Sequence, residues 1–185
     1  VFCSSLAIIE KHQIDVGGYV KGAGYSSYNT YIGELRPIVS DLKEYDSGFY
    51  RMEKTVHRKT NDPYLLDMNG LSGSTSTLNE ETITLLNRLG LSAKAHWTKY
   101  LGGTPVLDSL LGVKYLICEN EDPQPLYDYL FTYDGDLAAY ENPYALSIAY
   151  GVNAELAELD ITSTDYSSPF ARMNSIVTSM LGSKS

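Results

Sequence analysis

The sequence predicts an α/β domain in which helices pack on a mixed β-sheet that ends in an antiparallel hairpin. Three observations predict this class. Segments with helical periodicity alternate with short apolar segments, as in α/β proteins. Residues 113–118 are almost uninterruptedly apolar, which is expected of a central strand with both faces covered. Asp134-Gly135, a typical tight-turn dipeptide, separates two further strand-like segments.

The composition fits one domain and argues against a nucleic-acid-binding surface and against a membrane-spanning helix. The chain has 185 residues, of which 43% are hydrophobic and 20% charged, as in soluble globular domains. Acidic residues outnumber basic ones by 23 to 14, and the formal charge of −9 argues against binding nucleic acid. No run approaches the ~20 apolar residues of a membrane helix. We therefore expect residues 1–185 to form a single soluble domain.

Six segments are expected to form strands. Alternation of apolar with polar or charged side chains indicates half-buried strands near Phe49 and near Ile148. The first residues of the chain are a mainly apolar run without an initiator Met, and we expect the chain to be cut from a longer protein. The expected strands are residues 1–9, 49–53, 113–118, 129–132, 137–140 and 146–150.

Four helices are expected, each from a start signal and a glycine that follows its end. Proline in the first helical turn predicts helices that begin at Pro37, Thr104-Pro105 and Ser168-Pro169. A capping box at Thr77–Glu80 predicts the fourth helix. The glycines that follow these helices, in chain order, are Gly48, Gly90, Gly112 and Gly182.

Cysteine and histidine indicate no metal site. Cys3 and Cys118 lie in apolar runs, where a reduced, buried thiol is the favoured interpretation and a disulfide between neighbouring strands is the alternative. The three histidines are widely spaced and match no metal-ligand pattern with either cysteine. We expect neither a metal nor a cofactor.

A hydroxyl-rich loop is the first candidate binding site. Ser72, Ser74, Thr75 and Ser76 precede the capped helix, and the free amides of a helix N-terminus favour phosphate or carboxylate groups. An ordinary loop with an N-cap is the competing interpretation. Arg51 joins these candidates, because a guanidinium suits phosphate and sugar oxygens.

Three other groups of residues allow two interpretations each. Arg51 and Glu53, two apart on one strand, could join Lys114 and Glu141 in a polar cluster, or all four could be solvated or structural charges. Asp134-Gly135-Asp136 has the form of a metal-binding D-x-D motif, but a hairpin turn is favoured. Trp97 with Tyr100 could stack on a sugar, or serve as a partly buried anchor.

Several segments together resemble the extracytoplasmic portion of the YfhO-type bacterial membrane protein family. The most specific are Leu110-Leu111-Gly112-Val113-Lys114-Tyr115 and Glu141-Asn142-Pro143, and the resemblance extends from about Glu10 onward. Together with the residues around these two segments, the matching segments are residues 49–53, 72–77, 107–117, 140–146 and 168–182.

The resemblance implies a domain of a polytopic membrane glycosyltransferase. Such a protein takes a sugar from a polyprenyl-phosphate carrier and transfers it to a cell-envelope polymer such as lipoteichoic acid. The implied location is the extracytoplasmic side of the cell membrane, beside the membrane helices of the parent protein. The general-base carboxylate is implied to lie in another part of that protein, so no catalytic residue is assigned here and this chain is expected to be inactive alone.

The alternative is a non-catalytic surface module that binds envelope glycans or scaffolds partner proteins. In either case Arg51, Ser72, Ser74, Thr75 and Ser76 are the expected substrate-binding residues. One observation opposes a polyanionic acceptor: a chain with a net charge of −9 repels a polyphosphate at long range.

Overall fold

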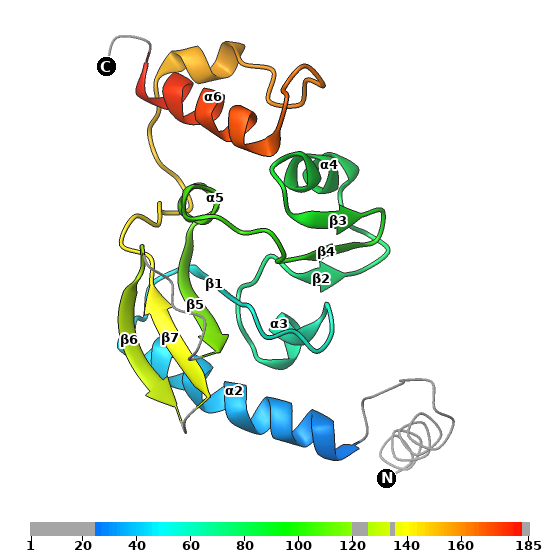
Figure 1. The fold of residues 1–185 in the computed structure, drawn as a ribbon, viewed down its shortest axis with the longest axis vertical. Helices are drawn as coiled ribbons and strands as arrows, with labels where there is room; N and C mark the ends of the chain where they lie inside the picture. Colours follow the sequence, from blue (N-terminus) through cyan, green and yellow to red (C-terminus); the bar gives the residue numbers. More distant parts are fainter. Residues whose placement is uncertain (1–24, 120–125, 134–135, 183–185) are drawn as a thin grey trace.

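Four strands form the main sheet of the computed structural model, which describes residues 25–119, 126–133 and 136–182 (Figure 1). Their order is β1-β5-β7-β6. β1 (Arg51–Lys54) runs parallel to β5 (Val113–Glu119), and the other two pairs are antiparallel. β6 (Asp128–Tyr133) and β7 (Leu137–Glu141) form the expected late hairpin, whose turn residues 134–135 lie outside the described residues. The mixed sheet confirms the predicted fold class.

β5 is central and both of its faces are buried, which explains its nearly continuous apolar sequence. Tyr115 and Ile117 point to one face, whereas Leu116 and Cys118 point to the other. Each pair belongs to a separate hydrophobic cluster, so the sheet divides the core into two halves. Cys118 is fully buried, as expected, whereas Cys3 lies outside the described residues.

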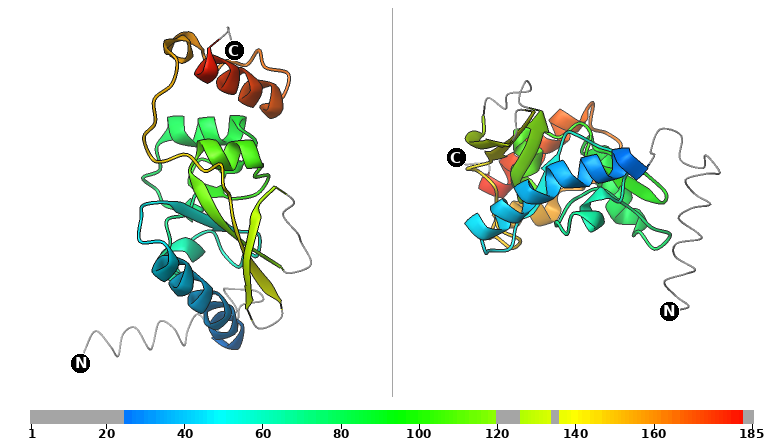
Figure 2. Two further views of the ribbon diagram at one scale, coloured as in Figure 1. Left: turned by 90° about the vertical axis from the view of Figure 1, so that its left-hand side faces the viewer. Right: turned by 90° about the horizontal axis from the view of Figure 1, so that it is seen from below.

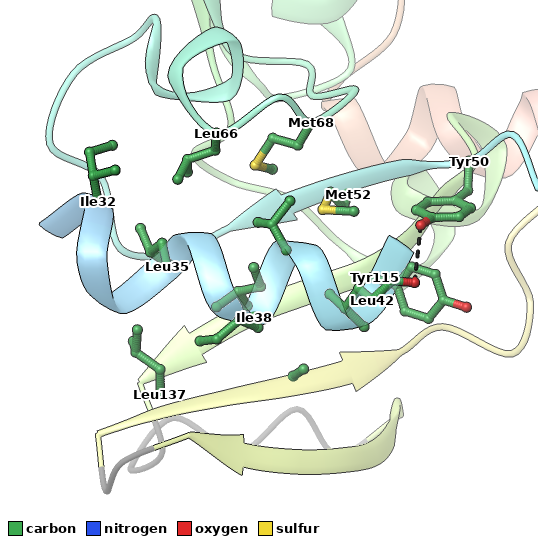
Figure 3. Close-up of a cluster of buried hydrophobic side chains, with 13 residues drawn as sticks. Ile32, Leu35, Ile38, Leu42, Tyr50, Met52, Leu66, Met68, Tyr115 and Leu137 are labelled. Carbon is green, nitrogen blue, oxygen red and sulfur yellow. Dashed lines mark hydrogen bonds between the residues drawn. The ribbon is translucent and has the colours of Figure 1, made fainter. Parts of the chain in front are cut away.

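One long helix covers the first face of the sheet. α2 (Tyr25–Tyr45) directs Ile32, Leu35, Ile38 and Leu42 onto the strands (Figure 3). Near the end of α2, the Tyr50 hydroxyl donates hydrogen bonds to the carbonyl oxygens of Leu42 at 3.2 Å and Asp46 at 3.0 Å. The same ring packs edge-on against Tyr115 with ring centroids 4.8 Å apart. Tyr50 therefore stabilises this half of the core through both the packing of its ring and the hydrogen bonds of its hydroxyl.

Three shorter helices contribute side chains to the hydrophobic cluster on the second face: α4 (Glu80–Arg88), α5 (Pro105–Leu110) and α6 (Pro169–Leu181). Of these, α5 packs on β5, whereas α6 lies farther from the main sheet (Figure 1). The molecule is elongated, with α6 and the 3-10 helix η1 (Ala154–Glu158) at one end and α2 at the other (Figure 2). The buried Arg172 joins α6 to α4, because its guanidinium donates to the carbonyl oxygens of Arg88 at 2.5 Å and Ser163 at 2.6 Å.

A small second sheet, which the sequence did not predict, lies beside the main one (Figure 1). It consists of β2 (Gly73–Ser74), β4 (Trp97–Lys99) and β3 (Ser92–Lys94) in the antiparallel order β2-β4-β3. α3 (Asp62–Leu65) precedes it in the chain. Strands of two or three residues are too short to show alternation, so no periodic signal marks them.

Two helix starts differ from the prediction. Pro37 lies inside α2 rather than at its first turn, so the helix begins twelve residues earlier. The amide that Pro37 lacks would have bonded to the carbonyl of Gly33, which is solvent-exposed and can be hydrated. α4 is capped by Asn79, whose side chain accepts from Thr82 N at 2.9 Å, so Thr77 is not the N-cap. The starts of α5 and α6, capped by Thr104 and Ser168, are confirmed.

Residues 146–150 do not form the expected strand. The segment is irregular, and Ser147, Ile148, Ala149 and Tyr150 are exposed. Both edges of β7 are already paired, with β5 and with β6. Residues 146–150, which follow β7 in the chain, therefore cannot pair with β7. The strand expected at residues 1–9 lies outside the described residues. Within the described part of the chain, no helix combines the length and apolar character needed to cross a membrane.

Candidate functional site

The candidate site is a surface groove with a volume of about 410 Å³. It lies where the start of β1, α3 and the loop that leads to β2 come together. This volume is within the range of small-ligand sites, roughly 300–1,000 Å³. The groove contains Arg51 and Ser72, two of the five predicted binding residues. Its lining residues are Phe49, Arg51, Pro63, Tyr64, Asp67, Met68, Asn69, Gly70 and Ser72.

Two aromatic rings of the groove face solvent. Phe49 is 60% exposed and Tyr64 is 69% exposed, although both are large and apolar. Met68, in contrast, is buried and belongs to the core cluster under α2. The groove therefore combines one buried apolar side chain with two large rings that remain accessible to solvent. Such rings are suited to stacking against a flat, weakly polar ligand surface.

Arg51 presents the positive charge of the groove. Its backbone N–H bonds to the carbonyl of Gly112 at 3.0 Å, and its Nη1 donates to the carbonyl of Leu111 at 2.6 Å. Gly112 has φ of +65°, and a Cβ there would lie 2.9 Å from the carbonyl oxygen of Leu146, so this turn requires glycine. Within the part of the chain that the structure describes, this side-chain hydrogen bond orients the guanidinium, and its other N–H groups can donate to a ligand.

Asp67 and Asn69 supply hydrogen-bond acceptors. Asp67 has a side chain that is 96% exposed and pairs with Lys43 at 2.5 Å. The hydrogen bond and charge of Lys43 lower the pKa of the Asp67 carboxyl, which is therefore ionised at neutral pH. The Asn69 Nδ2 donates to the carbonyl of Tyr50 at 3.3 Å, so its Oδ1 is directed elsewhere. Sequence reasoning missed both residues, and the Asn69-Gly70 turn signal was the only local hint of a shaped loop.

A buried carboxylate fixes the wall of the groove. Glu53 on β1 accepts hydrogen bonds from the backbone N–H groups of Leu71 and Ser72, the latter at 2.8 Å. The Ser72 hydroxyl lies 3.3 Å from the same carboxylate oxygen and accepts from Tyr100 N at 2.9 Å. Burial raises the pKa of Glu53, and the backbone donors oppose that rise. Because its hydroxyl has these partners within the protein, the role of Ser72 is to shape the groove and not to bind a ligand directly.

The rest of the hydroxyl loop lies outside the groove. Ser74 donates from its hydroxyl to the carbonyl of His96 at 3.1 Å, and the Thr75 hydroxyl is 3.1 Å from that of Thr77. Ser76 is exposed. The helix N-terminus that was expected to attract an anion begins only at Asn79, and Glu80 and Glu81 occupy its first turn. The structure thus separates Ser74, Thr75 and Ser76 from Arg51.

A second buried network lies on the other side of β1. Lys54 Nζ is 3.4 Å from Asp62 Oδ2 and 3.2 Å from His57 Nδ1, and the side chains of Lys54 and Asp62 are fully buried. Tyr31 donates its hydroxyl to Asp62 at 2.9 Å. Burial would raise the pKa of Asp62, but bonds from the amides of Lys59 and Arg58 and from Tyr31 outweigh it, and the pKa is lowered. This network holds α2, β1 and α3 together.

The remaining sequence candidates have structural partners. Tyr100 is buried, and its hydroxyl donates to Asp108 Oδ2 at 2.7 Å, as the Tyr127 hydroxyl also does, so Tyr100 is an anchor and not a stacking platform. Lys114 does pair with Glu141, at 3.5 Å, but its closer partner is Asp46 at 2.5 Å.

Arg51 and Glu53 have other partners than Lys114 and Glu141, and a register shift after Arg51 interrupts the regular pairing of β1 with β5. The structure therefore favours the second interpretation, in which these side chains are structural charges with separate partners. The D-x-D segment includes residues 134–135, which lie outside the described residues. Among the described side chains, no group of three or more His, Cys, Asp or Glu residues could hold a metal ion.

The comparisons with known proteins give one match. A family model described as bacterial membrane protein YfhO matches residues 7–185, which is nearly the whole chain. No curated protein and no solved structure matches the chain.

Proposed function

This chain belongs to the YfhO family of bacterial membrane proteins, and on that basis we propose that it is an extracytoplasmic domain of a membrane-bound glycosyltransferase. The parent enzyme transfers a sugar from a polyprenyl-phosphate carrier to a cell-envelope polymer such as lipoteichoic acid. The domain stands beside the membrane helices of that protein and contributes binding and not the chemical step.

The groove around Arg51 is the observation that carries this proposal. It combines an oriented guanidinium, two exposed rings and two acceptor side chains in one concave surface. Ligand sites are concave and carry a small number of polar groups that fix the orientation of the ligand. The groove has such groups in Arg51, Asp67 and Asn69. Arg51 is the substrate-binding residue that we retain from the sequence. Ser72 supports the groove wall.

The carboxylates of this chain support a role in binding over one in catalysis. A general base must reach the acceptor hydroxyl within about 2.6–3.2 Å and needs a pKa near the working pH. Glu53, Asp62 and Asp108 are buried and accept hydrogen bonds from the protein itself. Asp67 does face the groove, but its pKa is lowered by Lys43, which makes it a weak base.

The groove also suits the alternative function, a non-catalytic module that binds envelope glycans within a parent protein that performs no transfer. The two functions differ in what happens to the polymer. Under the first, deletion of the gene that encodes this chain removes sugar from the envelope polymer. Under the second, the sugar content stays the same and only the binding or localisation of a partner changes.

The test measures the ratio of sugar to phosphate in extracted lipoteichoic acid from wild-type, deletion and complemented cells. A loss of sugar on deletion, with recovery on complementation, supports the glycosyltransferase. An unchanged ratio contradicts it and favours the glycan-binding module. The 185-residue chain alone is expected to transfer no labelled sugar from a polyprenyl-phosphate hexose, and measurable turnover would contradict the role in binding.

A further inference from the structure

We infer that the groove recognises a neutral pyranose ring, and that a phosphate group is not its principal ligand. This inference rests on the proposed function and names the chemical class of ligand for the same site. The groove is lined by the rings of Phe49 and Tyr64 and by the polar side chains of Arg51, Asp67 and Asn69.

The exposed rings favour a sugar over an inorganic anion. A pyranose has faces of C–H groups that pack on aromatic rings, whereas phosphate has no apolar face. Phe49 and Tyr64 remain 60% and 69% exposed, although the core clusters on either side of the sheet bury most large apolar side chains. The hydroxyl of Tyr64 lies against Gly73, where an added Cβ would be 3.3 Å from it, so the ring is positioned by β2.

The polar groups match sugar hydroxyls, which both donate and accept. Arg51 offers N–H donors, the Asn69 Oδ1 offers an acceptor, and the Asp67 carboxylate offers two acceptor oxygens. A phosphate accepts only, unless protonated, and would meet the negative charge of Asp67 at the same site. The mixture of donors and acceptors therefore selects for hydroxyl groups.

The charge of the whole chain leads to the same choice. Arg51 and Asp67 carry opposite charges in the groove, and Lys43, paired with Asp67 at 2.5 Å, leaves the three side chains with a net charge of only +1. The chain as a whole carries a formal charge of −9, which repels a polyanion at long range but has little effect on a neutral ring. A neutral sugar unit avoids the conflict that a polyphosphate acceptor creates.

The experiment titrates the 185-residue chain with methyl β-glucopyranoside, maltotriose and glycerol phosphate, and follows ¹H–¹⁵N chemical shifts. We expect saturable shifts from at least one saccharide at Phe49, Tyr64 and the Asn69 side chain, with a dissociation constant on the order of 1 mM. Glycerol phosphate is expected to produce weaker shifts, confined to Arg51.

Matched variants assign the binding to the rings. Tyr64→Ala is expected to weaken saccharide binding about tenfold, while Tyr64→Phe keeps the ring and retains most of it. The control is Tyr144→Ala, because Tyr144 is 67% exposed but lies outside the groove, and it should leave binding unchanged. Circular dichroism melting checks that each variant is folded.

Three outcomes overturn the inference: no saturable shift with any saccharide, equal losses in Tyr64→Ala and Tyr144→Ala, or saturable binding of glycerol phosphate alone. These outcomes are distinguishable from failure of the proposed function, which is judged by the sugar content of the polymer in cells. If deletion of the gene removes sugar from the polymer but the groove binds no saccharide, the proposed glycosyltransferase function stands and only the inference about the groove fails.

Discussion

The buried carboxylate of Glu53 accepts a hydrogen bond of 2.8 Å from the backbone N–H of Ser72, and so ties the wall of the groove to the edge of the main sheet. Ser72 in turn accepts from Tyr100 N, which extends the connection to the small sheet. The loop between α3 and β2 is therefore held in place by hydrogen bonds to both sheets. A ligand site on this loop is preorganised, because the loop shape does not depend on the ligand.

Gly70 provides the first prediction. A Cβ at this position would lie 2.8 Å from Pro63 Cγ and 2.9 Å from Glu53 Oε1, so Gly70→Ala must displace the groove wall. We expect a loss of about 1–3 kcal/mol in the free energy of unfolding, measured by urea denaturation. The control Gly33→Ala, at an exposed position of α2 with no atom within 4 Å, should stabilise by about 0.5–1 kcal/mol. Equal effects at the two glycines would contradict this account of the groove wall.

The second prediction compares a buried ion pair with an exposed one. Asp62→Ala leaves the buried ammonium of Lys54 without its carboxylate and removes one of the two acceptors of the Tyr31 hydroxyl, the other being the carbonyl oxygen of Val56. The expected loss of stability is about 3–5 kcal/mol. Lys43→Ala breaks the exposed pair with Asp67 and should have a much smaller effect, because solvent screens that pair. Losses of similar size would show that the buried network does not hold α2 to α3.

The third prediction concerns pH. Burial, and next the charge of Lys54, lower the pKa of His57 from 6.5 to about 4. Between these two values the unfolded chain binds the proton and the folded chain does not, so this residue makes stability fall as the pH drops from 6.5 to 4. Since the ring is partly exposed, we expect a contribution of about 1–2 kcal/mol.

The measurement for His57 is the difference in unfolding free energy between the wild type and His57→Gln at several pH values. Taking the difference removes the contributions of ionisable groups that both proteins share and that do not interact with His57. His96→Gln, at an exposed position, serves as the control for replacing a histidine. A difference that is the same at pH 4 and pH 7 would contradict the assignment.

The main sheet could be predicted because its strands carry strong local signals. β5 is apolar throughout, and the β6–β7 hairpin surrounds an Asp-Gly dipeptide. The helices α5 and α6 begin at a capping residue followed by proline, which restricts the backbone before any tertiary contact forms. In these elements the local preference and the final packing agree.

The errors arose where tertiary contacts outweigh local preference. Pro37 reads as a helix start, but the apolar face that includes Ile32 and Leu35 packs on the sheet and extends α2 across the proline. Residues 146–150 alternate like a strand, but they pair with none of the described strands, and Leu146 N donates instead to the carbonyl oxygen of Ser109 in α5 at 3.0 Å. The small sheet depends on pairing among segments that are each too short to be recognised alone.

The candidate site was predictable only in part. Arg51 and Ser72 were selected for their chemistry, and both line the groove. Asp67, Asn69, Phe49 and Tyr64 were missed, because the groove forms only when α3 folds against the start of β1. The hydroxyls of Ser74 and Thr75 bond within the protein, and sequence spacing does not reveal those partners.

The most direct test of the central claim is the sugar-to-phosphate ratio of lipoteichoic acid in cells whose full-length protein carries Arg51→Ala with Tyr64→Ala. With equal amounts of protein in the membrane, we predict a ratio well below that of wild-type cells, and a wild-type ratio for the control Tyr144→Ala. A wild-type ratio in the groove variant would contradict the claim that this domain contacts the substrate through the groove.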